Sequence, residues 1–222
     1  GVPQYSRTGA KPTYMDSLDF VSGVTGRAVL LRQSRERELG KVKGRASGLN
    51  FDASGLLYGE RGAIAFWFQP QWDGSDPGIR SGSHSTGPSL ISVASVEPTY
   101  YGQFVRMQIK GGSFYIWVVD AEGSWHGPNY GAQVKTWRRQ QWRHLALTWN
   151  CEKGVRFFDN GTLMHDTWGK ERWRPATPRS IGIGSDAPSG RPQVVRAADM
   201  AMDDLFLFDH AIDTADVQAL MT

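Results

Sequence analysis

Cysteine is almost missing from this sequence of 222 residues, which contains only Cys151. A single cysteine excludes an intramolecular disulfide, so cysteine usage does not indicate a redox compartment. No apolar run approaches the roughly 20 residues that a membrane-spanning helix needs, and we therefore expect no membrane insertion. No charged segment followed by an apolar run opens the sequence, so we expect a secretion signal to be absent or already removed.

A strong charge of either sign is also absent, because 25 basic and 22 acidic residues give a net charge of +3. There is no dense basic run and no nucleic-acid motif, so we expect no nucleic-acid partner. Arginine nevertheless far outnumbers lysine among the basic residues. A guanidinium group binds carboxylate, sulfate or phosphate through a planar fork of donors. We expect most arginines to pair with surface acids and some loop arginines to be candidates for an anionic ligand.

Residue patterns of common catalytic sites are missing as well. Glycoside hydrolysis needs two carboxylates flanking one bond, and no closely spaced set of acids lies on one predicted strand. Asp120 and Glu122 are two residues apart, but Glu122 belongs to a Glu-Gly turn signal. Cys151 has no evident base, and neither a zinc-ligand cluster nor a glycine-rich phosphate loop occurs. We predict that the protein is not an enzyme.

Short alternating or apolar runs, separated by clusters of Gly, Pro, Asn and Asp, fill most of the chain. Such runs predict β-strands, and the lack of interleaved helical patterns predicts antiparallel hairpins. The pairs Gly111-Gly112 and Asn160-Gly161 are suited to tight hairpin turns. Strands are predicted at Arg27–Leu31, Gly62–Gln69, Ser89–Ser95, Gln103–Lys110, Ser113–Asp120, Arg143–Asn150, Gly154–Asp159, Ser180–Gly184 and Ala201–Phe208.

The predicted fold is all-β: a two-sheet antiparallel β-sandwich (jelly roll) with a short C-terminal helical turn. Asp213 is a candidate N-cap for this helix, with Asp216 three residues later and Val217 and Leu220 on its buried face. No shift in composition divides the chain, so we expect residues 1–222 to form one domain.

Six segments resemble, in family order, the strand motifs of laminin-G-like domains in the concanavalin A-like lectin/glucanase superfamily. The resemblance implies a jelly-roll fold, but this fold hosts many different functions. Similar bacterial domains bind sugars or mediate adhesion within secreted enzymes and surface proteins, which implies a secreted, extracellular or cell-surface location. The segments are residues 23–31 (GVTGRAVLL), 61–72 (RGAIAFWFQPQW), 142–150 (WRHLALTWN), 155–161 (VRFFDNG), 180–184 (SIGIG) and 201–212 (AMDDLFLFDHAI).

The predicted function is a non-catalytic carbohydrate-binding module that recognises a polysaccharide or oligosaccharide. Binding would use aromatic stacking with polar and arginine contacts, and the arginine excess favours an acidic glycan. We expect a monomer that is tethered to a catalytic or surface domain and raises the local substrate concentration. The alternatives are a protein-interaction or adhesion domain of the laminin-G type and a divergent glycan hydrolase or lyase.

Many aromatic residues lie in segments otherwise rich in Gly, Pro and polar residues. A sugar ring can stack its C–H bonds on an indole or phenol ring, which gives an exposed aromatic a partner. The alternative is that several of these rings fold back and anchor their loops, since Trp is highly buried on average. Trp125, Tyr130 and Trp173 are the predicted ligand contacts among Trp72, Tyr100, Tyr101, Trp125, Tyr130, Trp137, Trp168 and Trp173.

Alternation along three strands predicts a second candidate surface. Residues between core-facing apolar positions point outward, because successive side chains of a strand lie on opposite faces. The alternative is an ordinary solvated sheet face. The predicted surface is the concave face of one sheet, lined by Arg106, Gln108, Tyr115, Trp117 and Arg156.

Asp203 is the candidate metal ligand. If Leu205 and Leu207 point inward, alternation puts Asp203 on the same inward face, where an unpaired carboxylate is costly. The resemblance implies a structural Ca²⁺ near such an aspartate, and calcium takes about six to eight oxygen ligands. The alternative is that Asp203 accepts backbone N–H groups of the N-terminal segment. Further calcium ligands would come from Asp16, Asp19 or Asp204.

Overall fold

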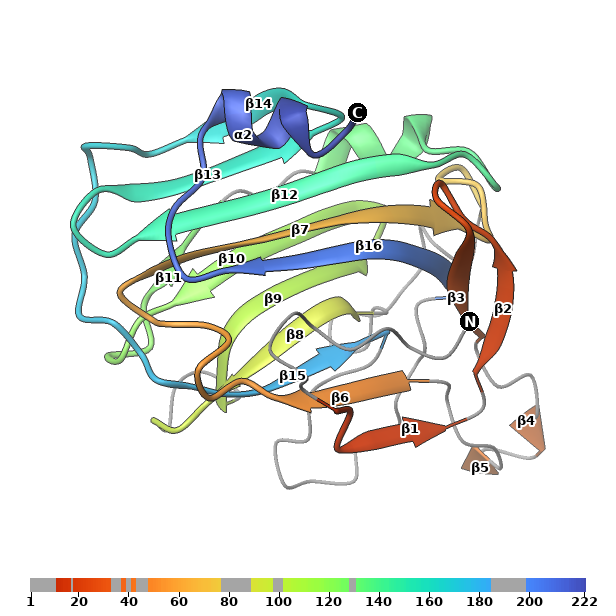
Figure 1. Ribbon diagram of the computed structural model, residues 1–222, viewed down its shortest axis with the longest axis horizontal. Coiled ribbons are helices and arrows are strands. Elements are labelled where there is room, and N and C mark those ends of the chain that lie inside the picture. Colours follow the sequence, from red (N-terminus) through yellow and green to blue (C-terminus); the bar gives the residue numbers. More distant parts are fainter. Residues whose placement is uncertain are drawn as a thin grey trace.

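The computed structural model describes residues 11–16, 18–32, 37–38, 41–42, 48–76, 89–97, 102–127, 131–184 and 199–222. Over these residues two antiparallel sheets form a sandwich, which confirms the predicted jelly-roll fold (Figure 1). The strand order of sheet A is β1 (Tyr14–Asp16), β6 (Gly48–Asp52), β15 (Pro178–Ile183), β8 (Ser89–Ser95), β9 (Gln103–Lys110), β10 (Ser113–Val119) and β11 (Trp125–His126).

The second sheet, sheet B, carries the remaining long strands and the C-terminal helix on its outer side (Figure 1). Its strand order is β14 (Thr162–Asp166), β13 (Gly154–Asp159), β12 (Arg143–Asn150), β7 (Arg61–Pro70), β16 (Met200–Phe208), β3 (Arg27–Leu31) and β2 (Asp19–Ser22). The other described elements are the pair β4 (Arg37–Glu38) and β5 (Lys41–Val42), the 3₁₀-helix η2 (Gly131–Thr136) and the helix α2 (Thr214–Ala219).

Strand β7 shows why the two sheets stack. Ile64 and Phe66 point into the main core, whereas Ala63 and Ala65 lie on the opposite face, in a smaller cluster with Val217 of α2. This is the period of two that a strand imposes on its side chains. The large residues therefore fill the space between the sheets, and the small alanines let the helix approach the outer face of sheet B.

Two hairpin turns have the backbone that their residues predict. Gly111 and Gly112 between β9 and β10 have φ angles of +57° and +76°. Asn160 and Gly161 between β13 and β14 have φ angles of +48° and +72°. Two consecutive positive φ angles are what a type I′ turn requires, and this turn matches the twist of the flanking strands.

Helix α2 begins with the predicted cap. The Asp213 carboxylate accepts N–H bonds from Ala215 at 2.8 Å and from Asp216 at 3.0 Å, and the Asp216 carboxylate accepts the N–H of Asp213 at 2.9 Å. This reciprocal arrangement satisfies backbone donors that a helix start otherwise leaves unpaired. The described residues contain no helix that is long and apolar enough to cross a membrane.

Replacing Asp213 with Ala is expected to lower the free energy of unfolding by about 1 kcal/mol, the usual cost of a lost N-cap. Urea denaturation followed by tryptophan fluorescence measures the change. Asp209→Ala is the matched control, because Asp209 is exposed and lies before the helix. An equal loss in both variants would contradict the capping role.

Candidate functional site

The most exposed tryptophan for which the structure gives an exposure lies on edge strand β11 of sheet A. Trp125 is 53% exposed and pairs with Val119 of β10. Its ring lies almost parallel to that of Trp117, with 5.3 Å between ring centroids and an interplanar angle of 7°. Trp117 is only 8% exposed. We call Trp117 and Trp125 the tryptophan stack, in which a buried indole supports an exposed one.

Cationic and phenolic groups flank the tryptophan stack. The guanidinium carbon of Arg106 lies 5.9 Å from the centre of the Trp117 ring. Tyr115 meets Trp117 edge-on at 6.1 Å, and the Lys110 ammonium lies 5.7 Å from the Tyr115 ring. Cations near aromatic faces are attracted by the ring quadrupole. The stack is therefore part of a mixed aromatic and basic surface along β9 and β10.

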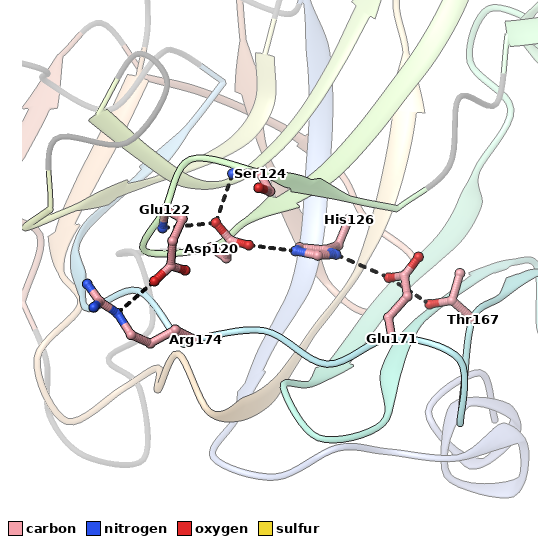
Figure 2. A network of polar contacts seen from close by, with 7 residues as sticks. All are labelled: Asp120, Glu122, Ser124, His126, Thr167, Glu171 and Arg174. Atoms are coloured by element: carbon pink, nitrogen blue, oxygen red, sulfur yellow. Dashed lines mark hydrogen bonds and ion pairs between the residues drawn. The ribbon is translucent and has the colours of Figure 1, made fainter.

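A polar network surrounds His126 of β11 (Figure 2). The His126 Nε2 atom lies 3.0 Å from Asp120 Oδ2, and its Nδ1 atom lies 3.3 Å from Glu171 Oε2. The Thr167 hydroxyl donates to the same Glu171 oxygen at 3.2 Å. Trp173 stacks on the His126 ring at 4.4 Å and 19°. Each polar edge of the imidazole and one of its faces are thus in contact with protein.

Asp120 also shapes the turn that leads into β11. Its Oδ1 atom accepts the backbone N–H of Glu122 at 3.0 Å and of Ser124 at 2.8 Å. Aspartate side chains stabilise turns by bonding to backbone N–H groups a few residues further along. Since neighbouring strand residues point to opposite faces, fixing His126 on one face fixes the direction of Trp125 on the other. The network therefore preorganises the tryptophan stack.

The predicted loop contacts have different outcomes. Trp125 is exposed as expected. Trp173 is 9% exposed and packs on His126, which fits the alternative of a loop anchor, and its contact with a ligand stays a prediction. Trp72 and Trp137 are likewise buried in the core. Tyr130, Tyr100 and Tyr101 lie outside the described residues.

The predicted orientation of the sheet A residues is confirmed, but the expected accessibility is not. Phe114, Ile116 and Val118 of β10 point into the core, so Tyr115 and Trp117 point outward. Arg106 and Gln108 also point outward, opposite Trp117 and Tyr115, yet they are only 7% and 5% exposed. Arg106 Nη1 donates to Gln103 Oε1 at 3.2 Å. Alternation predicts the face of a side chain but not whether that face is accessible.

Arg156 does not belong to this surface. It lies on β13 of sheet B, whereas Arg106 and Trp117 lie on β9 and β10 of sheet A. The outer faces of two stacked sheets point in opposite directions, so these residues cannot line one concave face. The pattern of a hairpin shows which residues point outward, but it does not show which sheet the hairpin joins.

The expected inward orientation of Asp203 is wrong, because β16 contains a bulge. Asp203 pairs with Trp67 and Phe206 pairs with Ala65, so β16 has one residue more than β7 between these pairs. Asp204 adopts a φ of +43° at this point. An extra residue reverses the inside-outside alternation. Leu205 therefore packs on the core, while Asp203 lies on the outer face with Trp67.

The carboxylate of Asp203 binds backbone N–H groups, as the alternative interpretation states. Its Oδ2 accepts from Thr25 and its Oδ1 accepts from Asp204, both at 3.1 Å. Burial, reinforced by the charge of Asp203, raises the pKa of the Asp204 carboxyl. Asp16 belongs to β1 of sheet A, not to sheet B. In the described part of the chain no three His, Cys, Asp or Glu side chains are grouped to hold a metal. Calcium binding at Asp203 and Asp16 stays a prediction.

The Asp120–His126–Glu171 network was not predicted. Its members come from three segments, and Glu171 lies 45 residues from His126 in the sequence. The only local signal is the alternation in Ser124-Trp125-His126, which puts the histidine opposite an aromatic residue. Contacts over such separations depend on how the β14–β15 connection folds against β11, and strand patterns do not encode that.

Cys151 is expected to react slowly with thiol reagents. It is 7% exposed, and burial followed by the charges of Glu152 and Glu60 raises the pKa of its thiol. The reactive form of cysteine is the thiolate, so both effects protect it. Ellman's reagent should label the native protein far more slowly than the denatured protein at pH 7.5. Immediate labelling of the native protein would contradict this.

The similarities to known proteins concern most of the chain. The family model Laminin_G_3, described as the concanavalin A-like lectin/glucanases superfamily, matches residues 43–218. No curated protein matches the chain by sequence.

Similar solved structures share the fold at low sequence identity. The botulinum neurotoxin serotype G binding domain has a TM-score of 0.68 and 12% identity, over 97% of this chain and 46% of that one. The serotype D ligand binding domain in complex with N-acetylneuraminic acid has a TM-score of 0.66 and 12% identity, over 96% and 45%. The chain thus spans about half the length of these toxin domains.

Another similar structure belongs to an extracellular enzyme. Domain 4 of an extracellular GH43 arabinanase from Geobacillus stearothermophilus, in complex with arabinotriose, has a TM-score of 0.60 and 15% identity. The alignment covers 93% of this chain and 82% of that domain. Identity at this level shows a common fold.

Proposed function

We propose a carbohydrate-binding role for this chain, which belongs to the concanavalin A-like lectin/glucanases superfamily. The ligand is a polysaccharide or oligosaccharide that stacks on the tryptophan stack. The observation that carries this proposal is Trp125, an indole 53% exposed and aligned within 7° of the buried Trp117 ring. An exposed indole offers a flat apolar face on which a sugar ring can stack.

The rigidity of the tryptophan stack suits a binding role. Trp117 supports the exposed ring from one side, and Asp120 and His126 hold the short strand that carries it. A side chain that is already ordered loses little conformational entropy on binding, so more of the contact energy appears as affinity. An indole that served only to anchor its own loop would be buried, as Trp173 is.

The similar structures support the class of ligand. Two of them are complexes with N-acetylneuraminic acid and arabinotriose. One is a toxin ligand-binding domain and one is a domain of an extracellular arabinanase, which supports attachment to a larger secreted or surface protein. We further propose a preference for acidic glycans, because the Lys110 ammonium lies beside Tyr115 and the chain carries a net charge of +3.

We propose that the domain binds without catalysis. Asp120 and Glu171 are the carboxylates on the two sides of His126, and each is already bonded to that ring. Asp120 is also only 5% exposed and holds the turn at Ser124. Glycoside hydrolysis needs one carboxyl group to act as an acid and a second to act as a base or nucleophile on a bound sugar. The Asp120 and Glu171 carboxylates are instead both bonded to His126 within the structural network.

The test is a titration of intrinsic tryptophan fluorescence with arabinan, dextran and polygalacturonate. Trp125→Ala is expected to lower the affinity for the bound glycan about 30-fold. This corresponds to about 2 kcal/mol of binding free energy for the ring area that is no longer buried. The matched control is Tyr58→Ala, which removes another exposed aromatic ring, 45% exposed, outside the tryptophan stack.

Three results would contradict the proposal. Unchanged affinity in Trp125→Ala would remove the tryptophan stack as the site. No fluorescence change with any glycan, together with binding of a protein ligand, would favour the adhesion alternative. Release of reducing ends or unsaturated products by the purified domain would show an enzyme.

A further inference from the structure

We propose that Arg156, Lys153 and Trp168 form a second binding site, which takes an oxyanion. The site lies on sheet B and the turns beside it, and it shares no residue with the tryptophan stack on sheet A. The anion is a carboxylate or a sulfate ester. Only the statement that a glycan carries this group rests on the proposed function.

Arg156 is held in one orientation by two contacts. Its guanidinium carbon lies 4.4 Å from the centre of the Trp168 ring, and its Nε lies 3.2 Å from Asp166 Oδ1. The same carboxylate oxygen accepts the backbone N–H of Trp168 at 2.7 Å. Asp166 thus fixes both the arginine and the turn that carries the tryptophan. An arginine that stacks and pairs in this way is preorganised for further hydrogen bonds.

The contacts of Arg156 use its Nε and one face of its guanidinium plane. In the described part of the chain, no other hydrogen bond or ion pair engages its two terminal nitrogens. The side chain is 25% exposed, and neither terminal nitrogen is among the buried side-chain atoms that lack a partner. Two parallel N–H donors match the spacing of two oxygens on a carboxylate or sulfate, which gives a strong, charge-assisted pair.

Further cations surround this arginine. The exposed Lys153 ammonium lies 5.7 Å from the Trp168 ring, and no carboxylate of the described residues pairs with it. Lys170 is exposed and its ammonium lies 3.5 Å from the backbone oxygen of Asp166. Three cations (Arg156, Lys153, Lys170) lie around one carboxylate (Asp166) at this site.

The nearest other acids have their own partners. Glu171 contacts His126 at 3.3 Å, and Glu152 lies 3.8 Å from Arg172. With Glu171 counted as an anion and Glu152 offset by Arg172, four cations face three carboxylates, which leaves a local charge of +1. A surplus of positive charge around an oriented guanidinium is the electrostatic arrangement that an oxyanion requires.

The test compares dextran sulfate, polygalacturonate and neutral dextran by isothermal titration calorimetry at low salt. Arg156→Gln is expected to lower the affinity for dextran sulfate or polygalacturonate at least tenfold. The affinity for neutral dextran should not change. Arg156→Lys keeps the charge but loses the planar fork, and it should still weaken binding several-fold. Arg179→Gln is the matched control, because it removes one exposed arginine from β15 of sheet A and should change affinity less than twofold.

The two acidic probes identify the anion that the site prefers. If Arg156→Gln loses more affinity for dextran sulfate, the anion is a sulfate ester; if it loses more affinity for polygalacturonate, the anion is the carboxylate of a uronic acid. Lys153→Gln is a second variant that leaves the Arg156–Asp166 pair intact, and it should weaken both acidic probes. Equal losses of affinity for the acidic polymers in Arg156→Gln and Arg179→Gln would overturn the proposal. Equal affinity of the unmodified protein for acidic and neutral polymers would overturn it as well. If Trp125→Ala keeps full affinity while Arg156→Gln loses it, the proposed function at the tryptophan stack fails and this site stands.

Discussion

Replacement of Asp159 by Ala is expected to lower the free energy of unfolding by about 3 to 5 kcal/mol. Asp159 on β13 receives two hydrogen bonds from Arg143 Nη2, at 2.8 and 2.6 Å, and the two side chains are 4% and 14% exposed. Arg143 also lies over the Trp137 ring at 5.1 Å. Removing the carboxylate leaves a buried cation without its counter-charge, which is far costlier than losing an exposed pair.

A double variant separates this cause from lost packing. Arg143→Met combined with Asp159→Leu removes both charges and is expected to recover most of the lost stability, because a buried ion pair and an apolar pair are often nearly equivalent. Guanidinium denaturation at pH 7 measures each variant. A loss below about 1 kcal/mol in Asp159→Ala would show that the pair behaves as a solvated surface contact.

Acidification from pH 7 to pH 5 is expected to cost about 2 kcal/mol of stability through His144 alone. His144 is fully buried, both of its ring nitrogens lack hydrogen-bond partners, and burial lowers its pKa from 6.5 to about 4. The unfolded chain therefore binds the proton more readily than the folded one. Neutral His144 therefore contributes its full share to the free energy of unfolding above the unfolded-state pKa. This share is lost as the pH falls from about 6.5 toward 4.

The measurement is the free energy of unfolding at several pH values for the unmodified protein and for His144→Gln. The variant is expected to lose less stability between pH 7 and pH 5, whatever its stability at pH 7. His210→Gln is the control, because the His210 side chain is 59% exposed. Parallel pH profiles for the unmodified protein and His144→Gln would assign the acid sensitivity to another group, such as His165, whose pKa burial also lowers.

The strands with strong alternation could be predicted almost to the residue. The bounds of β3, β8, β9, β12 and β13 equal those predicted, β7 is one residue longer at each end, and β10 is one residue shorter at its C-terminal end. Strands β1, β2, β4, β5, β6, β11 and β14 were missed. Tyr14–Asp16 and Asp19–Ser22 are short, and Thr162–Asp166 is only partly buried, so their apolar period is weak.

The candidate site was predicted in part. Trp125 was identified correctly as an exposed aromatic, because it lies in a polar, turn-rich segment. Trp173 has the same kind of neighbours and yet is buried, since the Asp120–His126–Glu171 network folds its segment against β11. Local composition cannot distinguish these cases, because burial depends on a segment 45 residues away.

The amino-acid sequence by itself determined the β-sandwich, its two type I′ turns, the capped C-terminal helix and the outward direction of Trp117, since each depends on neighbours within one or two strands. The tertiary structure decided which sheet Arg156 joins, which face Asp203 occupies and which tryptophan stays exposed. These features depend on a sheet assignment, a bulge and a network formed by distant segments. Strand periodicity carries information about two faces of one strand, and only packing brings separate strands together.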